Sequence, residues 1–107
     1  MLFKADLLAK VLSGQKTETR RTGKNQYKED SIQPINSNYT KPVAYIKILK
    51  KTRQPLCCMT EKNAQKEGFN NLMEFRDVWR QINGNYNPDQ VVTVYEFKLI
   101  KKEKESC

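Results

Sequence analysis

Hydrophobic residues recur at helical spacing in two parts of the chain. Between residues 4 and 13 the apolar side chains are one, three or four positions apart and fall on one stripe of a helix: Leu7, Leu8, Val11 and Leu12. Between residues 71 and 84 the steps are three, four and three: Leu72, Phe75, Trp79 and Ile82. Asn71 is suited to cap the start of this second helix, and Gly84 to end it. Its position on the apolar stripe predicts Trp79 as a core residue rather than a base-stacking platform.

Alternating and β-branched positions predict strands in two other segments. Residues 43–49 contain buried-type side chains at every second position, as in a half-buried strand: Ala44, Ile46 and Ile48. A continuation of this strand would carry a basic edge through Lys50, Lys51 and Arg53. Residues 91–100 are apolar enough for a central or near-central strand, with Val91, Tyr95, Phe97 and Leu99 on one face.

The remaining segments are more polar. Residues 22–41 predict a long loop with at most short strands, and Thr60 is suited to cap a short helix that runs to Lys66 and stops at Gly68. The order of helix, strands, two short helices and strand is α+β. A small curved sheet or barrel with helices at its ends would bury these stripes.

Length and composition indicate the number of domains, the cellular location and whether the protein spans a membrane. A chain of 107 residues is long enough for one domain, so we expect residues 1–107 to form a single domain with a charged tail at residues 101–107. No apolar run reaches the length of a membrane helix, and the three cysteines fit neither a disulfide framework nor a zinc site. We therefore expect a cytoplasmic protein with reduced thiols and no membrane partner.

The net charge and the absence of histidine limit the kinds of partner, catalytic site and metal site that the sequence predicts. Twenty Lys and Arg against twelve Asp and Glu give a net charge of +8, which is typical of a nucleic-acid partner but also arises on basic surfaces without one. The chain has no histidine, which excludes Ser-His-Asp and Cys-His arrangements and the commonest zinc ligand. We expect no metal and no cofactor.

Residues 14–21 carry the most informative mixture of side chains. A glycine that can end the first helix is followed by one lysine, two threonines, a glutamate and two arginines: Gly14, Lys16, Thr17, Glu18, Thr19, Arg20 and Arg21. Such a polar strip at the edge of a core suits a phosphate-bearing or polar ligand. Arg21 could recognise phosphate or carboxylate, because its planar fork suits both.

This strip resembles the G-x-K-T-x-T-x-R signature of the ASCH domain family, whose fold is PUA-like. Later blocks resemble the family in the same order and spacing, and together they cover nearly the whole chain apart from residues 22–41 and the tail: residues 60–64, 67–69, 74–79 and 94–97. The resemblance implies a small mixed β-barrel flanked by short helices, a cleft beside the first helix, and a role in binding or processing RNA or modified nucleosides.

One bacterial branch of the family is similar in removing the acetyl group from N4-acetylcytidine, with a lysine and a threonine of the signature and a later glutamate. The resemblance carries these catalytic positions to Lys16, Thr19 and Glu67. Residues 22–41 differ in length and composition from that branch, so the substrate is not fixed by the resemblance. The positions expected to contact ligand or RNA are Thr17, Arg20, Arg21, Lys50 and Lys51.

The residues also set a geometric condition. In an extended strand, residues 16 and 19 point to opposite faces, so a joint role for Lys16 and Thr19 requires a turn after Gly14. With no histidine present, a neutral Lys16 or an ionised Glu67 would have to activate the Thr19 hydroxyl. Without the family resemblance, solvated lysines and a strand-forming threonine explain the same residues.

The sequence and the family resemblance together leave three candidate functions. The first is an RNA- or nucleotide-binding module with a basic cleft beside the first helix. The second is a small amidohydrolase acting on an N-acylated nucleoside such as N4-acetylcytidine. A ribonuclease is the weakest of the three, because the chain offers no histidine pair or carboxylate cluster for metal-assisted cleavage.

Overall fold

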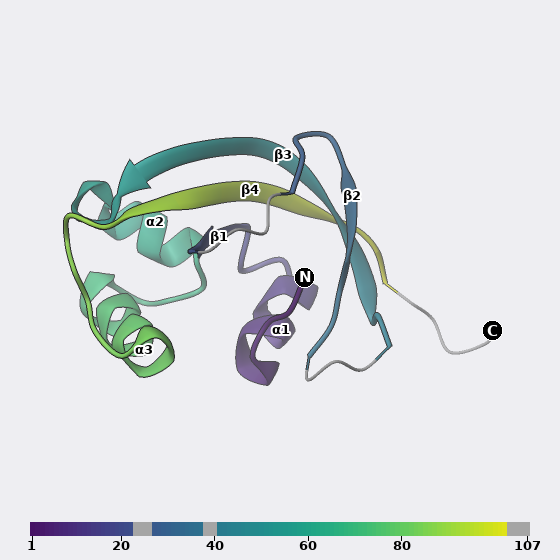
Figure 1. Cartoon of the computed structure of the whole chain (residues 1–107). Helices are drawn as coiled ribbons and strands as arrows, with labels where there is room; N and C mark the ends of the chain where they lie inside the picture. The colour runs from purple at the N-terminus through teal and green to yellow at the C-terminus, as the bar shows by residue number, and fades with distance from the viewer. Residues whose placement is uncertain (23–26, 38–40, 103–107) are drawn as a thin grey trace.

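A curved antiparallel sheet arches over three short α-helices in the computed structural model of the chain (Figure 1), which describes residues 1–22, 27–37 and 41–102. The strands are β1 (Glu18–Arg21), β2 (Ile32–Ile35), β3 (Ala44–Pro55) and β4 (Val91–Lys102). The helices are α1 (Ala5–Leu12), α2 (Glu61–Lys66) and α3 (Leu72–Asn83), with a 3-10 turn at Leu56–Cys58. The α+β class and the half-barrel of strands with short helices confirm the expected fold.

The sheet has the order β1-β4-β3-β2, so β4 is a central strand, as its composition predicts. Among the described residues, the three strand pairings are antiparallel, and an isolated parallel bridge joins Leu2 to Asn36. The long β3–β4 ladder shifts register between Tyr45 and Ile46 and again between Ile48 and Lys50. Such irregularities add local twist and bend, which helps this pair to curl around the helices.

The core lies between the concave face of the sheet and the helices. Its members come from the N-terminal segment, α1, β3, α3 and β4, and include Phe3, Val11, Ile46, Ile48, Phe75, Trp79, Tyr95 and Phe97. The prediction that Trp79 is a core residue is confirmed, because its exposed fraction is 6%. Ile82, which was expected on the same buried face, is 53% exposed, because the last turn of α3 extends past the sheet-facing core.

Helix ends follow the local sequence closely. Thr60 caps α2 in a reciprocal pair with Asn63, and Asn71 caps α3 by accepting a hydrogen bond from the Glu74 backbone N–H. Gly84 ends α3 in the left-handed conformation, with φ of 88°. These three caps were all predicted from residue type alone.

Strand boundaries and one face differ from the sequence-based expectations. β3 continues to Pro55 and β4 to Lys102, which includes two residues assigned to the tail, because each strand gains ladder partners from the other. Val91 is exposed, while Val92, Thr93, Val94 and Tyr95 are all buried, because β4 is covered on both faces near β1. Residues 23–26 and 38–40, within the predicted loop, and residues 103–107, within the predicted tail, lie outside the described residues. In the described part of the chain, no helix has the length and apolar character needed to cross a membrane.

Candidate functional site

The chain turns sharply between α1 and β1, and this turn places Lys16 ahead of the strand. Gly14 has φ of 84°, a conformation that glycine adopts without the steric cost of a side chain. The backbone N–H groups of Gln15 and Lys16 both donate to the carbonyl of Lys10, each at 3.0 Å. Lys16 therefore lies before β1, and the direction of its side chain does not follow the alternation of side chains along that strand.

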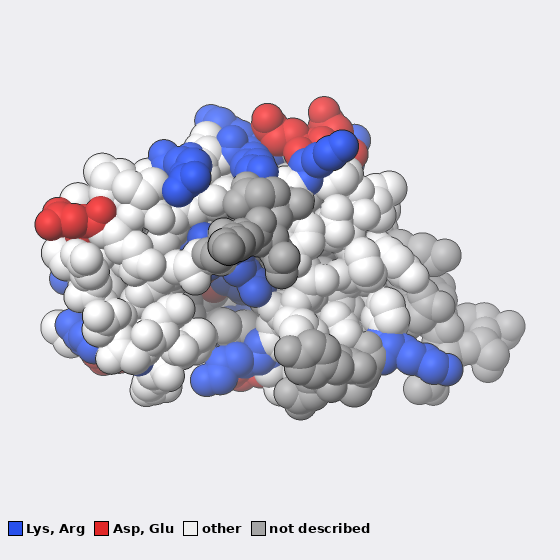
Figure 2. All heavy atoms as spheres, viewed as in Figure 1, with Lys and Arg blue, Asp and Glu red and all other residues white. Residues whose placement is uncertain are grey.

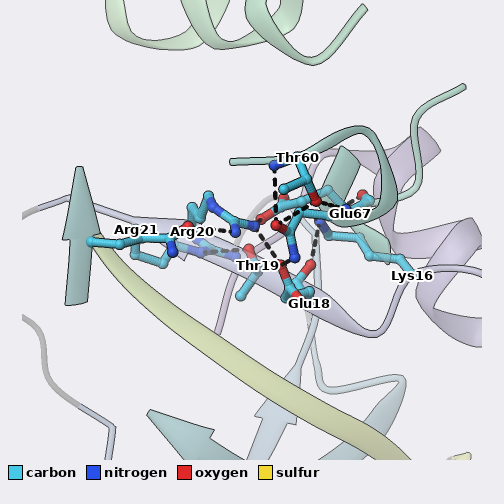
Figure 3. Close-up of polar contacts among 9 residues, drawn as sticks. Lys16, Glu18, Thr19, Arg20, Arg21, Thr60 and Glu67 are labelled. Atoms are coloured by element: carbon cyan, nitrogen blue, oxygen red, sulfur yellow. Dashed lines mark hydrogen bonds and ion pairs between the residues drawn. The ribbon is translucent and has the colours of Figure 1, made fainter. Parts of the chain in front are cut away.

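The Lys16 ammonium is buried and all three of its protons have acceptors. Nζ donates to the backbone carbonyl of Glu18 at 2.9 Å, to the backbone carbonyl of Glu67 at 2.8 Å and to Oε1 of Glu67 at 2.9 Å. Only 2% of Lys16 and 3% of Glu67 is exposed. Figure 3 shows the two side chains meeting from the turn before β1 and the end of α2. Because both charges are buried, removal of either one would leave the other without its partner in a site that water does not solvate.

Arg20 joins Glu67 to a second buried carboxylate. Its Nη1 donates to Oε2 of Glu67 at 2.9 Å and to Oε1 of Glu18 at 2.6 Å, and its Nη2 donates to Oε1 of Gln54 at 2.8 Å. Asn63 adds a donor to Oε1 of Glu18 at 3.3 Å. Glu18 and Arg20 are two positions apart on β1 and so share one face of the strand. We call Lys16, Glu18, Arg20 and Glu67 the buried charge cluster.

Thr19 and Arg21 lie on the other face of β1. Arg21 Nε donates to Oγ1 of Thr19 at 3.3 Å, and Arg21 Nη2 donates to the backbone carbonyl of Leu2 at 2.7 Å. The guanidinium also lies over the ring of Phe3, 4.8 Å from its centroid. Because Thr19 Oγ1 accepts this bond, its own proton is left to be donated elsewhere.

These two faces meet at one pocket of about 230 Å³ between α1, β1 and α3. Its polar lining comes from Lys4, Lys16, Thr19, Arg20, Arg21, Thr22, Glu67 and Asn83, and its apolar lining includes Phe3, Leu7, Phe69, Phe75 and Trp79. The volume falls below the ~300–1,000 Å³ of sites that enclose drug-sized ligands, so the pocket suits one small ligand rather than a strand.

Two residues of the pocket lining have a buried hydrogen-bond donor without a partner. Nε of Arg20 and Nε1 of Trp79 are buried and have no hydrogen-bond partner among the described residues. The side chains of both residues line the pocket. An unpaired buried donor costs about 1–3 kcal/mol, so these two groups reduce the stability of the fold beside the pocket.

Burial lowers the pKa of Lys16 below its ordinary value. The ion pair with Glu67 opposes this change, and the charges of Arg21 and Arg20 lower the pKa further. Burial also lowers the pKa of Arg21. A lysine with a depressed pKa can exchange its proton at a pH where an exposed lysine stays charged.

The structure brings together Lys16, Thr19, Arg20, Arg21 and Glu67 from the residues proposed on sequence grounds, and all five line the pocket. Lys16 contacts Glu67 directly, whereas no hydrogen bond joins Lys16 to Thr19 in the described residues. The other three proposed residues lie outside the pocket lining: Thr17, Lys50 and Lys51. Thr17 is exposed, and its backbone links α2 to β4 through bonds with Lys66 and Phe97.

Sequence reasoning missed the part played by Glu18 and Gln54. The sequence indicated Glu18 only as one member of the polar strip of residues 14–21, yet it is buried and binds Arg20. The shared face of residues 18 and 20 on a strand was the available signal. Gln54 had no signal, because only the β3–β4 pairing carries it to Arg20. Among the described residues, no group of three or more His, Cys, Asp or Glu side chains is placed to hold a metal ion.

Comparison with known proteins gives one consistent result. The family model described as the ASCH domain matches residues 1–101. An ASCH domain from Lactobacillus crispatus JV V101 is similar with a TM-score of 0.78 and 17% identity, over 90% of this chain and 71% of that one. A search of curated proteins found no match.

Two further solved structures are similar in fold. Protein EF3133 from Enterococcus faecalis V583 has a TM-score of 0.71 and 21% identity, over 91% of this chain and 68% of that one. An ASCH protein from Zymomonas mobilis has a TM-score of 0.67 and 12% identity, over 95% of this chain and 70% of that one. At these identities the likeness concerns the fold alone.

Proposed function

This chain belongs to the ASCH domain family of PUA-like domains, and we propose that it is a small amidohydrolase that removes an acyl group from an N-acylated nucleoside such as N4-acetylcytidine. The observation that carries the proposal is the buried contact between Lys16 and Glu67 in the wall of a pocket that Thr19 also lines. A nucleophile, a proton acceptor and a space for one small ligand are thereby grouped in one place.

The chemistry assigns one role to each residue. Thr19 Oγ1 attacks the carbonyl carbon of the acyl group, and its proton passes to the Lys16–Glu67 pair. The bond between the acyl carbon and the base nitrogen then breaks, and the nitrogen takes the proton as it leaves as a free amine. Water hydrolyses the acyl-threonine ester to release the acid and restore Thr19.

Two features support these roles. The depressed pKa of Lys16 favours the loss of a proton that an exposed lysine would keep, and Arg21 donates a hydrogen bond to Thr19 Oγ1, which favours removal of the hydroxyl proton before attack. The proton transfer requires Thr19 Oγ1 to approach Lys16 when the ligand is bound, directly or through a water molecule. Catalytic hydrogen bonds often tighten only in the complex.

The direct test is incubation of the purified protein with N4-acetylcytidine, followed by chromatography for cytidine and acetate. We expect conversion by the wild type and none by Lys16→Ala. Lys62→Ala is the control, because Lys62 is an exposed lysine on α2 outside the pocket. Absence of conversion by the wild type, or conversion that survives Lys16→Ala, would reject the proposal.

RNA binding is the second candidate, supported by the net charge of +8 and by exposed cations on the long strands. Figure 2 shows Lys and Arg side chains gathered over β3 and β4, with acidic side chains beside them. Lys50 and Arg53 are exposed on β3, and Lys98 is exposed on β4. These positions lie outside the pocket and would contact a phosphate backbone without reading bases.

A salt titration tests this candidate separately. If Lys50 and Lys51 contact phosphates of single-stranded RNA, the double variant Lys50→Gln/Lys51→Gln should reduce the slope of log affinity against log salt by about 1.4, at ~0.7 for each contact. An unchanged slope would remove both lysines from the interface, and no RNA binding by the wild type would reject this candidate.

A further inference from the structure

The pocket holds an unbalanced positive charge. Its lining contains four cationic side chains, Lys4, Lys16, Arg20 and Arg21, and one acidic side chain, Glu67. Glu18 lies behind the lining and is bound to Arg20. The four residues of the buried charge cluster, which include Glu18, carry two positive and two negative charges. Arg21 adds a third positive charge, which no ion pair balances among the described residues.

Among the described residues, Arg21 is the cation of this group that forms no ion pair with a carboxylate. The two carboxylates nearby are already engaged, because Glu67 binds Lys16 and Arg20, and Glu18 binds Arg20. In the described part of the chain, the hydrogen bonds of Arg21 go to a hydroxyl and a backbone carbonyl, through Nε and Nη2. A partly buried charge without a counter-ion is costly, and an anion in the pocket would offset that cost.

The guanidinium is also fixed in position before any ligand arrives. Two hydrogen bonds and the contact with the Phe3 ring hold its plane, while the side chain still lines the pocket. A planar, pre-ordered guanidinium binds phosphate oxygens with little further loss of side-chain entropy. Lys4 lines the same pocket and is exposed, which makes it a second cation at the rim.

We propose that Arg21 and Lys4 form a binding site for the phosphate group of a nucleotide, so that this pocket binds a nucleoside monophosphate more tightly than the neutral nucleoside. This inference rests on the proposed function only for the identity of the base. The phosphate would lie at the Arg21 and Lys4 side of the pocket, while the apolar lining of Phe69, Phe75 and Trp79 would face the base. The volume of about 230 Å³ favours one nucleotide unit over a longer strand.

Isothermal titration with cytidine, cytidine 5′-monophosphate and cytidine 3′-monophosphate tests the phosphate site directly. We expect at least one monophosphate to bind the wild type about tenfold or more tightly than cytidine, the difference that one charge-assisted contact supplies. Inorganic phosphate should compete with that monophosphate. Equal affinity for cytidine and both monophosphates, or no binding of any of the three, would overturn the proposal.

Variants then assign the effect to these residues. Arg21→Gln should abolish the preference for the monophosphate, and Lys4→Gln should reduce it. Arg53→Gln removes the same charge from an exposed position on β3 outside the pocket and should leave the preference unchanged. A thermal unfolding curve of each variant confirms folding, and Lys4→Gln keeps the test decisive if Arg21→Gln does not fold. A preference that survives both pocket variants would overturn the assignment.

The outcome separates this inference from the proposed function. Tight binding of a monophosphate by a protein that does not hydrolyse N4-acetylcytidine or its monophosphate would reject the amidohydrolase and leave the phosphate site standing. Hydrolysis of N4-acetylcytidine with no preference for a phosphate would reject the phosphate site alone.

Discussion

Lys16 Nζ lies 2.9 Å from Oε1 of Glu67, although the two residues are 51 positions apart in the sequence. The same ammonium also donates to the backbone carbonyl of Glu67 at 2.8 Å. The end of α2 and the turn before β1 are thus joined by a buried charge. The contact combines a structural and a chemical role, and the predictions below separate the two.

Replacing Lys16 with methionine should destabilise the protein by about 3 kcal/mol, because Glu67 loses one of its two cationic partners in a buried site. Methionine keeps most of the side-chain volume, so the loss reports the charge rather than a cavity. Urea unfolding measures the difference. Lys62→Met, at an exposed position of α2, should change stability by less than about 0.5 kcal/mol. An equally small loss in Lys16→Met would show that Lys16 contributes little to stability.

The stability provided by Lys16 should rise with pH. Because burial lowers its pKa in the folded state, the unfolded chain binds more protons between the folded pKa and the ordinary lysine value of about 10.4. Unfolding is therefore increasingly disfavoured as pH rises through that window, and below it the cost of charging Lys16 is fully present. The stability difference between wild type and Lys16→Met should grow towards alkaline pH. A difference that shrinks would mean that the folded state raises the pKa.

Replacing Glu67 with glutamine should lower the pKa of Lys16 further. The carboxylate is the group that raises this pKa against the effect of burial, and the amide keeps the shape but not the charge. Titration of the lysine Nζ signal by nuclear magnetic resonance measures the change without any need for turnover. Asp77→Asn is a matched control, because Asp77 is an exposed acid on α3 paired with Arg80. An unchanged Lys16 titration in Glu67→Gln would rule out this electrostatic coupling.

Thr19 should be required for turnover but not for folding. Thr19→Ala removes the proposed nucleophile and should abolish conversion of N4-acetylcytidine, whereas Thr19→Ser keeps a hydroxyl and should retain part of the rate. Thr19 is buried, so each variant needs an unfolding curve alongside the assay. Full activity in a folded Thr19→Ala protein would remove Thr19 from the mechanism.

Gly68 should tolerate substitution less well than Gly84. Both have positive φ, 97° and 88°, so alanine costs roughly 1–2 kcal/mol of backbone strain at either position. At Gly68, an added Cβ would also lie 3.0 Å from Cδ of Lys10 and 3.5 Å from Cβ of Lys16, whereas nothing lies within 4 Å at Gly84. Urea unfolding of Gly68→Ala and Gly84→Ala should show the larger loss at Gly68. Equal losses would mean that the lysine side chains move aside freely.

The sequence by itself determined the helices, their caps and the main strands. The stripe from Leu72 to Trp79 and the capping residues Thr60, Asn71 and Gly84 act within a few positions of themselves, so local spacing is enough to read them. The composition of residues 91–100 likewise indicated a strand buried in the middle of the sheet, which is the position of β4. The alternation of β1 places Thr19 and Arg21 on one face, where Arg21 binds the threonine oxygen.

Tertiary structure alone decided which charges are paired. Nothing local to Arg20 indicates that Gln54 accepts its hydrogen bond, because that contact depends on β4 lying between β1 and β3. The exposure of Ile82 and the extension of β3 to Pro55 also follow from where partner strands and helices end. Burial then lowers the pKa of Lys16, and the pairing of the nearby carboxylates with Lys16 and Arg20 leaves Arg21 without a direct ion pair among the described residues. The residue types define which reactions and contacts the side chains can take part in. The contacts in the folded chain decide which of these side chains are already paired and which remain available to a ligand.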